Sequence, residues 1–304
     1  MKKDHDKLKE LASKHLGKAG DGTTVKPYIT PYKHDPSLLV SLPRSLNRDK
    51  SDISEYGEGF EAWHAYEMSF LGKNGKPITG ILKAVFSAHT ENMVESKSFK
   101  LYLNSFDLEK FSSVEEVTSI IQSDLNTACK GQVEVSFHLA HLASFSNSPL
   151  KFTTVDNLDF EVNSYTEDSS ILESSVEYEG EEEGVLDFHT ANLRSNCEIT
   201  NQKDTGNCFI FIKGKSLPSL ENLARYVFSF RNSQHFHENA TEIMYNTILD
   251  KFKPSTLFVG NIYNRRGGLD IHSIRVKDPT QQITPIVKNT FGNSKILVAK
   301  TSQQ

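Results

Sequence analysis

The sequence has few cysteines, because only Cys129, Cys197 and Cys208 occur among its 304 residues. Three cysteines cannot form a fully paired disulfide framework, so a disulfide-rich secreted fold is excluded and a reducing compartment is favoured. No segment approaches the roughly 20 consecutive apolar residues that a membrane-spanning helix needs. The basic N-terminal segment, residues 1–18, lacks the apolar stretch of a signal peptide. We therefore expect a soluble cytoplasmic protein.

Several common binding motifs are also missing. The sequence contains no G-x-G-x-x-G fingerprint and no P-loop, so a bound nucleotide would not be held by a Rossmann or P-loop device. It contains no C-x-x-C and no H-E-x-x-H, and the spacings of His138 to His141 and of Cys197 to Cys208 are not typical of a zinc site. We expect no bound metal.

The composition is that of a folded protein, with 37% hydrophobic and 24% charged residues. The length favours two domains, since a domain commonly has roughly 100–200 residues. The net charge of −5 is unevenly distributed. Residues 152–193 contain twelve acidic and no basic residues, which leaves +7 for the rest of the chain. A block of like charge is typical of a solvated, loosely packed segment, and we interpret it as the join between two halves.

The two halves follow the same order of patterns. Each has a Tyr-x-x-Ser-Phe segment, residues 102–106 and 226–230, before an amphipathic helical stretch, residues 115–125 and 238–249. Strand-like runs lie at residues 60–70, 78–87, 132–139, 186–200, 207–213, 256–263 and 269–276, with turns near 72–77 and 204–206.

This order predicts an α+β fold of two tandem modules, each an antiparallel sheet with a pair of helices on one face. We place the first module at residues 1–150, the acidic connector at 151–185 and the second module at 186–304.

Four short clusters carry candidate chemistry. In the first, Glu95 precedes a helix that begins near Ser98, and Ser96, Lys97 and Lys100 crowd its first turn. A helix N-terminus with lysines suits an anion, and the carboxylate could accept hydrogen bonds from a ligand. The structural alternative is a helix cap with solvated lysines.

The second cluster is Cys197, between Asn196 and Glu198 at a predicted strand end, with Asp204 across a hairpin. Asp204 could return close to the sulfur and act as an acid. The alternative is an inert cysteine, since a free cysteine is most often a small buried apolar residue.

The last two clusters lie in the second half. Phe236-His237-Glu238 opens a helix, where a histidine can serve as a general acid or base and the glutamate suits the first turn. Arg265-Arg266-Gly267-Gly268 allows close backbone approach and bidentate phosphate contacts. The structural alternatives are a capping glutamate beside a surface histidine, and a basic turn between strands.

Together these segments resemble one family, the NADPH-dependent 7-cyano-7-deazaguanine reductases, in their long two-module form. The stretch Glu95-Ser-Lys-Ser-Phe-Lys-Leu-Tyr102 is similar to the motif that distinguishes this family from the GTP cyclohydrolases, and residues 39–48 resemble its N-terminal segment. Residues 195–200, 236–238 and 265–271 match in order and rough spacing. The likeness runs from about residue 16 to residue 275.

The resemblance implies a tunnelling fold in each half and a homodimer. The net charge of −5 argues against a general nucleic-acid binder, and we expect neither a nucleic-acid nor a membrane partner. The resemblance also implies that two NADPH reduce the nitrile of 7-cyano-7-deazaguanine to a primary amine, in tRNA queuosine biosynthesis. By the same resemblance Cys197 would be the nucleophile that forms a covalent thioimide, Asp204 the proton donor, and His237 the residue that positions substrate and assists proton transfer. A thioimide accepts hydride more readily than a nitrile, so covalent catalysis divides one difficult step into easier ones.

The resemblance also assigns binding residues. For the substrate these are Val94, Glu95, Ser96, Phe236, His237 and Glu238. For NADPH they are Ser96, Lys97, Arg265, Arg266 and Gly267.

Two other functions remain open from the sequence. One is a cyclohydrolase-like enzyme of the same fold, which would need a zinc ligand set. The other is a protein that binds a pterin or purine without turnover, for which Cys197 would be dispensable.

Overall fold

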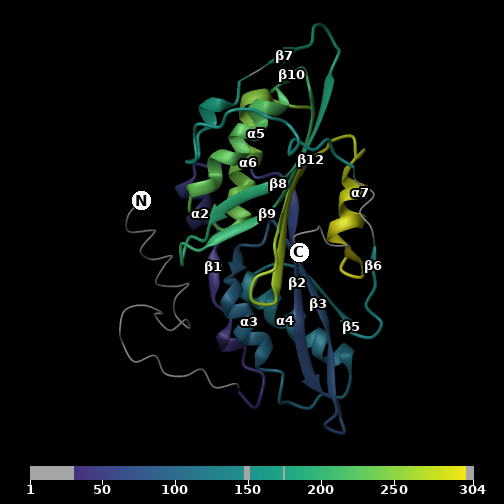
Figure 1. Cartoon of the computed structure of the whole chain (residues 1–304). Helices are drawn as coiled ribbons and strands as arrows, with labels where there is room; N and C mark the ends of the chain where they lie inside the picture. Colours follow the sequence, from purple (N-terminus) through teal and green to yellow (C-terminus); the bar gives the residue numbers. More distant parts are fainter. Residues whose placement is uncertain (1–30, 147–150, 174, 299–304) are drawn as a thin grey trace, which may run out of the picture.

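A computed structural model describes residues 31–146, 151–173 and 175–298 of the chain (Figure 1). Its centre is a seven-stranded sheet with the order β5-β3-β2-β12-β11-β9-β8, in which all neighbouring strands are antiparallel. The strands are β2 (Glu58–Leu71), β3 (Pro77–Ser87), β5 (Val133–Leu139), β8 (Gly184–Asn196), β9 (Lys203–Gly214), β11 (Thr256–Tyr263) and β12 (Leu269–Lys277). The β2–β12 pairing joins the strands of the first half to those of the second.

Helices and short strands surround this sheet. The helices are α2 (Arg44–Lys50), α3 (Ser96–Asn104), α4 (Val114–Cys129), α5 (Leu220–Ser229), α6 (His237–Phe252) and α7 (Thr284–Val287). The short paired strands are β1 (Ser41–Pro43) with β4 (Asn92–Val94), β7 (Val176–Glu177) with β10 (Ser216–Leu217), and β6 (Phe145–Ser146) with β13 (Leu297–Val298). Short 3₁₀ turns are Pro36–Leu38, Ser169–Ile171 and Phe230–Asn232, and a π-helical turn spans Lys288–Gly292. None of the helices in the described ranges has the length and apolar character to cross a membrane.

Both halves place their paired helices on the same face of the sheet. Helices α3 and α4 pack on β2, β3 and β5, while α5 and α6 pack on β8, β9 and β11 (Figure 1). The opposite face is covered by α7 and the π-helical turn, which pack against apolar residues of β2, β11 and β12. This arrangement confirms the predicted α+β class with antiparallel strands and a helix pair for each half.

The predicted helices form for the expected reasons. In α4, buried side chains recur every four residues at Val117, Ile121, Leu125 and Cys129, which is one face of a helix. Ser113 caps this helix by accepting a hydrogen bond from the backbone N–H of Glu116. Cys129 is thus a core residue of the first half.

The hairpin between β8 and β9 differs from its prediction. The expected turn near residues 204–206 is wrong, because β9 already begins at Lys203 and Asp204 lies within the strand. The chain reverses at residues 197–202 instead, where Cys197 exchanges backbone hydrogen bonds with Gln202 and Asn201. Asn201 adopts a left-handed conformation with φ of 56°, which asparagine tolerates well. Gly206 allows β9 to pack closely against β11, since a Cβ at this position would lie only 2.4 Å from the Ile262 carbonyl oxygen.

The acidic segment is packed more closely than its charge indicates. Val155 and Leu172 are buried in the core of the second half. The Tyr165 carbonyl accepts a hydrogen bond from the Asn232 N–H, and the Glu167 carboxylate lies 3.0 Å from His235 Nε2. The expectation of a loosely packed segment is therefore wrong for these residues, because apolar side chains between the acidic ones anchor it.

A buried charge network holds the junction between the halves. Arg275 of β12 is fully buried, and its Nη2 lies 2.5 Å from Glu61 Oε1 of β2 and 2.7 Å from Glu242 Oε1 of α6. Arg44 of α2 lies 2.6 Å from the other oxygen of Glu61. Burial favours the neutral form of Glu61, but the Arg275 and Arg44 guanidiniums outweigh it and lower the pKa of this carboxyl. The network thus ties two helices to the pair of strands that joins the halves.

We predict that Arg275→Met lowers the free energy of unfolding by about 3–5 kcal/mol, because it leaves two carboxylates buried without their shared cation. Chemical denaturation of the full chain measures this. As a matched control, Glu91→Gln breaks the exposed Lys130–Glu91 ion pair and should cost less than about 1 kcal/mol. Equal effects of the two substitutions would contradict a structural role for the network.

Candidate active site

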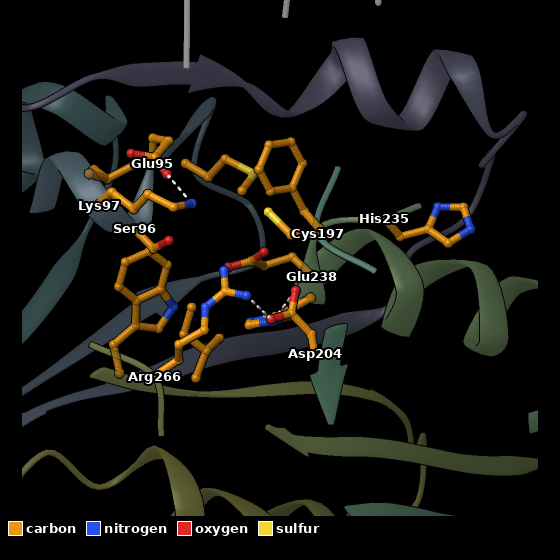
Figure 2. A pocket seen from close by; sticks show the side chains of 14 residues that line it. Glu95, Ser96, Lys97, Cys197, Asp204, His235, Glu238 and Arg266 are labelled. Atoms are coloured by element: carbon orange, nitrogen blue, oxygen red, sulfur yellow. Dashed lines mark ion pairs between the residues drawn. The ribbon is translucent and has the colours of Figure 1, made fainter. Parts of the chain in front are cut away.

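Segments from both halves meet at one pocket (Figure 2). The first half contributes β2, β4 and the start of α3, and the second half contributes the turn after β8, the start of β9, the start of α6, and β12 with the turn before it. The expected residues in its lining are Val94, Glu95, Ser96, Lys97, Cys197, Asp204, Phe236, His237, Glu238 and Arg266. The fold thus brings together all four clusters that the sequence indicated.

Glu95 fits both interpretations made from the sequence, as a helix cap and as a hydrogen-bond acceptor for a ligand. It is the N-cap of α3, and its Oε2 accepts a hydrogen bond of 2.7 Å from the Ser98 N–H. Its other oxygen, Oε1, lies 3.6 Å from Lys97 Nζ (Figure 2). The carboxylate is 1% exposed and lines the pocket. The helix cap therefore also fixes a buried acceptor in the site.

Cys197 differs from the other two cysteines in its electrostatic surroundings. Burial disfavours the thiolate, but the nearby Lys97 ammonium and hydrogen bonds from Thr200 and Ile199 outweigh it and lower the pKa of the Cys197 thiol. In contrast, burial raises the pKa of Cys129 to about 12 and also raises that of Cys208. Cys197 is therefore the cysteine in this chain whose surroundings favour the nucleophilic thiolate.

Asp204 forms a charged cluster with two partners. Its Oδ2 lies 3.3 Å from His237 Nε2, and its Oδ1 lies 2.8 Å from Arg266 Nη1 (Figure 2). Burial favours its neutral form, but the hydrogen bond and charge of His237, with the charges of Arg266 and Lys97, lower the pKa of its carboxyl. In the free site Asp204 is thus a carboxylate paired with His237, rather than an isolated acid.

His237 is held in a defined orientation. Its ring stacks on that of Tyr263, with centroids 3.8 Å apart and planes inclined by 14°. Stacking fixes the plane of the imidazole while Asp204 holds one of its nitrogens. The neighbouring His235 points away from the group and contacts Glu167 and Asn239 instead (Figure 2).

Glu238 is a buried hydrogen-bond acceptor whose hydrogen bonds within the described part of the protein are incomplete. Its side chain is 4% exposed, and its Oε1 has no hydrogen-bond partner in the part of the chain that the structure describes. Burial, with a contribution from the charge of Glu61, raises the pKa of this carboxyl. A buried oxygen without a donor is costly unless a ligand supplies one.

A second, wider pocket adjoins the first and encloses about 970 Å³, part of it open to solvent. The two share Ser96, Lys97, His237, Arg266 and Ile271. Gly267 lines the second pocket and has a left-handed φ of 60°. Cationic side chains attract phosphate, and a glycine beside them allows the phosphate to approach the backbone because glycine has no Cβ. The pocket therefore suits a phosphate-bearing ligand.

Arg265 is the expected site residue that lines neither pocket. Its guanidinium lies 4.9 Å from the centre of the Tyr66 ring, a cation–π contact on β2. Lys100, which the sequence analysis named with Lys97 at the start of the helix, lines the second pocket. The residues that sequence reasoning missed are Trp63, Met93, His235 and Ile271 in the first pocket, and Leu101, Gln202, Asn264 and Leu269 in the second. Trp63 and Ile271 have the pattern of ordinary strand residues.

Comparisons with known proteins agree with this geometry. Residues 28–137 match the family model "Nitrile reductase, 7-cyano-7-deazaguanine-reductase N-term", and residues 209–282 match "QueF-like protein". The NADPH-dependent 7-cyano-7-deazaguanine reductase of Hahella chejuensis (strain KCTC 2396) is 35% identical over 270 residues, which cover 87% of this chain and 93% of that protein.

A solved structure, the archaeosine synthase QueF-Like in the apo form, covers 33% of this chain and 96% of its own, with 14% identity and a TM-score of 0.28. That likeness is too low to support an argument about the fold. The two family models and the extended identity show that this chain belongs to the NADPH-dependent 7-cyano-7-deazaguanine reductases, a family of nitrile oxidoreductases.

Proposed function

We propose that this chain reduces the nitrile of 7-cyano-7-deazaguanine to an aminomethyl group, consuming two NADPH and two protons for each nitrile, through a covalent thioimide on Cys197. The observation that carries this proposal is the pocket where a thiol of lowered pKa, the Asp204–His237 pair and two buried glutamates converge. A thiol, a proton-transfer pair and hydrogen-bond acceptors are the groups that addition to a nitrile on a purine-like ring requires.

The substrate's guanine-like edge carries a ring N–H and an amino group, and both are donors. Glu95 of the first half and Glu238 of the second both line the pocket with buried carboxyl groups, and Glu238 Oε1 lacks a donor among the described residues. A site built to accept such donors discriminates strongly against analogues without them, because its acceptors would remain unpaired. Val94, Ser96 and Phe236 line the same pocket and would enclose the ring.

The Cys197 thiolate would add to the nitrile carbon, and the nitrile nitrogen would take a proton. Asp204 is ionised in the free site, so its carboxylate alone has no proton to donate. We therefore assign this proton to Asp204 and His237 together, which can exchange it across their 3.3 Å contact. Release of the sulfur after the first reduction restores the thiolate, which the Lys97 charge again favours. The lowered thiol pKa therefore serves both bond formation and bond cleavage.

The second pocket supports NADPH binding beside the thiol. Ser96, Lys97, Arg266 and Gly267 line it, and Arg265 would assist from its place on Tyr66. Lysine and arginine side chains suit the additional phosphate of NADPH. When bound, NADPH supplies hydride, twice in each turnover. The pathway, tRNA queuosine biosynthesis, and the homodimeric, cytoplasmic state remain predictions of the family resemblance.

We predict that the protein, mixed with 7-cyano-7-deazaguanine without NADPH, gains the full mass of the substrate, since addition to a nitrile releases no leaving group. Intact-protein mass spectrometry measures this adduct. Cys197→Ala should abolish it, whereas the control Cys129→Ala should retain it because Cys129 is buried in the core. An adduct on the Cys197→Ala protein would refute the assignment of the nucleophile.

We expect Asp204→Asn to retain substrate binding and to reduce kcat by about 10²–10⁴-fold, because the amide cannot share a proton with His237. NADPH oxidation gives kcat, and calorimetric titration gives the substrate Kd. Turnover equal to that of the unmodified protein would rule out the proton-transfer role.

A further inference from the structure

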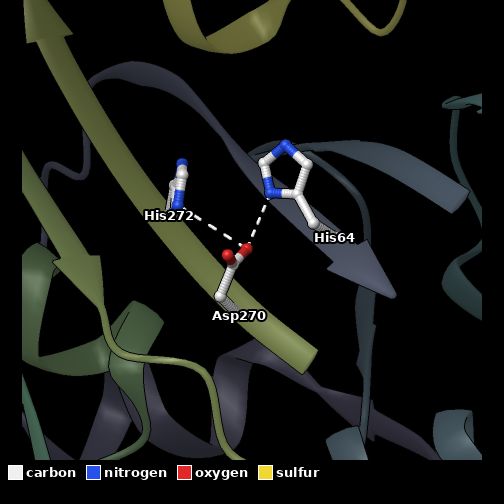
Figure 3. Close-up of side chains that lie close together, drawn as sticks. All are labelled: His64, Asp270 and His272. Atoms are coloured by element: carbon white, nitrogen blue, oxygen red, sulfur yellow. Dashed lines mark hydrogen bonds and ion pairs between the residues drawn. The ribbon is translucent and has the colours of Figure 1, made fainter. Parts of the chain in front are cut away.

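Three buried polar side chains lie together on the sheet face opposite the active site (Figure 3). Successive residues of a strand point to opposite faces. Trp63 and Ile271 face the active-site pocket, so His64, Asp270 and His272 face the other way. The three side chains are between 1% and 5% exposed. They lie on β2 and β12, the strand pair that joins the two halves.

The distances suit a shared cation. His64 Nδ1 lies 2.7 Å and His272 Nε2 lies 3.6 Å from the same oxygen, Asp270 Oδ1. The three ligand atoms lie within 4.8 Å of one another. Two ligands about 2.1 Å from a tetrahedral metal are about 3.4 Å apart. The contact to His272 is close to that separation, whereas the 2.7 Å contact to His64 is a direct hydrogen-bond distance that would lengthen by about 0.7 Å when an ion is bound.

The surroundings support the carboxylate as a ligand. Tyr66 donates a hydrogen bond of 2.6 Å to the second oxygen, Asp270 Oδ2, and hydrogen-bonded ligands of this kind are common at metal centres. The neighbouring Lys83 ammonium donates to the carbonyl oxygens of Asn293 and Ile296, so its hydrogen bonds are directed to the C-terminal segment. His64 Nε2 is buried and has no hydrogen-bond partner within the described ranges, so the hydrogen bonds of this group are incomplete.

We propose that His64, Asp270 and His272 bind a divalent first-row transition metal, with zinc as the best-suited ion, which crosslinks the two halves behind the active site. Two imidazoles and one carboxylate suit such an ion, and they leave a further position for water. This site does not depend on the proposed reaction. It also departs from our expectation of no metal, because His64 lies 206 residues from Asp270 and no local spacing could reveal the complete set of three.

Metal analysis of the full-length protein tests this site without an activity assay. Protein treated with a chelator is dialysed, incubated with zinc chloride and desalted, and bound zinc is measured by elemental analysis. We expect one zinc per chain in the unmodified protein. Cys197→Ala should keep it, because no thiolate is involved, and so should the control His138→Gln, a histidine outside the group on β5, which pairs with β3. His272→Gln removes a ligand and should weaken binding by more than about 100-fold, since the loss of a mere outer-shell partner already costs about 10–100-fold.

The coordination of the bound zinc provides a readout on the unmodified chain. X-ray absorption should show nitrogen and oxygen ligands with imidazole scattering and no sulfur at about 2.3 Å. Three outcomes would overturn the proposal: less than stoichiometric zinc in the unmodified protein, a sulfur ligand, or zinc retained by His272→Gln and lost by Cys197→Ala. Since none of these readouts uses turnover, failure here leaves the proposed reaction untouched.

Discussion

The pairing of β2 with β12 is the constraint on which the active site depends. It sets Trp63 opposite Ile271, so one residue from each half forms adjoining parts of the pocket wall. The same pairing brings Glu95 and Lys97 of the first half to Cys197 and Asp204 of the second. Neither half contains a complete site alone. The buried contacts of Arg275 with Glu61 and Glu242 hold this junction, because separating the strands would leave these charges unpaired.

Nearby charges and hydrogen bonds, rather than burial, distinguish Cys197 from the other two cysteines. All three cysteines are buried, and burial by itself disfavours a thiolate. The pKa of Cys197 is nevertheless lowered, because Lys97 and nearby hydrogen-bond donors surround it, whereas the pKa values of Cys129 and Cys208 are raised. Lys97 also contributes to the lowered pKa of Asp204. A cation from the first half thus favours the thiolate of the second, and it adds a smaller effect at Asp204 to those of His237 and Arg266.

Much of the fold followed from periodicity and turn residues. Strand β11 was predicted at its observed bounds, and the apolar spacing of α4 identified the face that packs on the sheet. The turn near Asp204 was wrong because Gly206 was interpreted as a turn residue, whereas it allows β9 and β11 to approach closely. The buried anchors Val155 and Leu172 were hidden in an acidic background.

The site was partly visible in the sequence, because its polar residues lie in short clusters. Their convergence was not derivable from spacing and came from family resemblance, since the clusters lie on segments far apart in the chain. Trp63 and Ile271 gave no signal, because a pocket wall and a core position have the same strand pattern. No pattern in the sequence indicated that His64 and His272 lie close together, because strand register rather than sequence distance sets which residues are cross-strand neighbours.

The central claim is that the junction places Lys97 where it activates Cys197. The most direct measurement is the pH dependence of Cys197 alkylation by iodoacetamide, because the rate follows the thiolate fraction. The account predicts a midpoint below 9.0, the ordinary value from which the pKa of this thiol is lowered, and a shift to higher pH in Lys97→Met. A midpoint at or above that value, or one that Lys97→Met leaves unchanged, would contradict it.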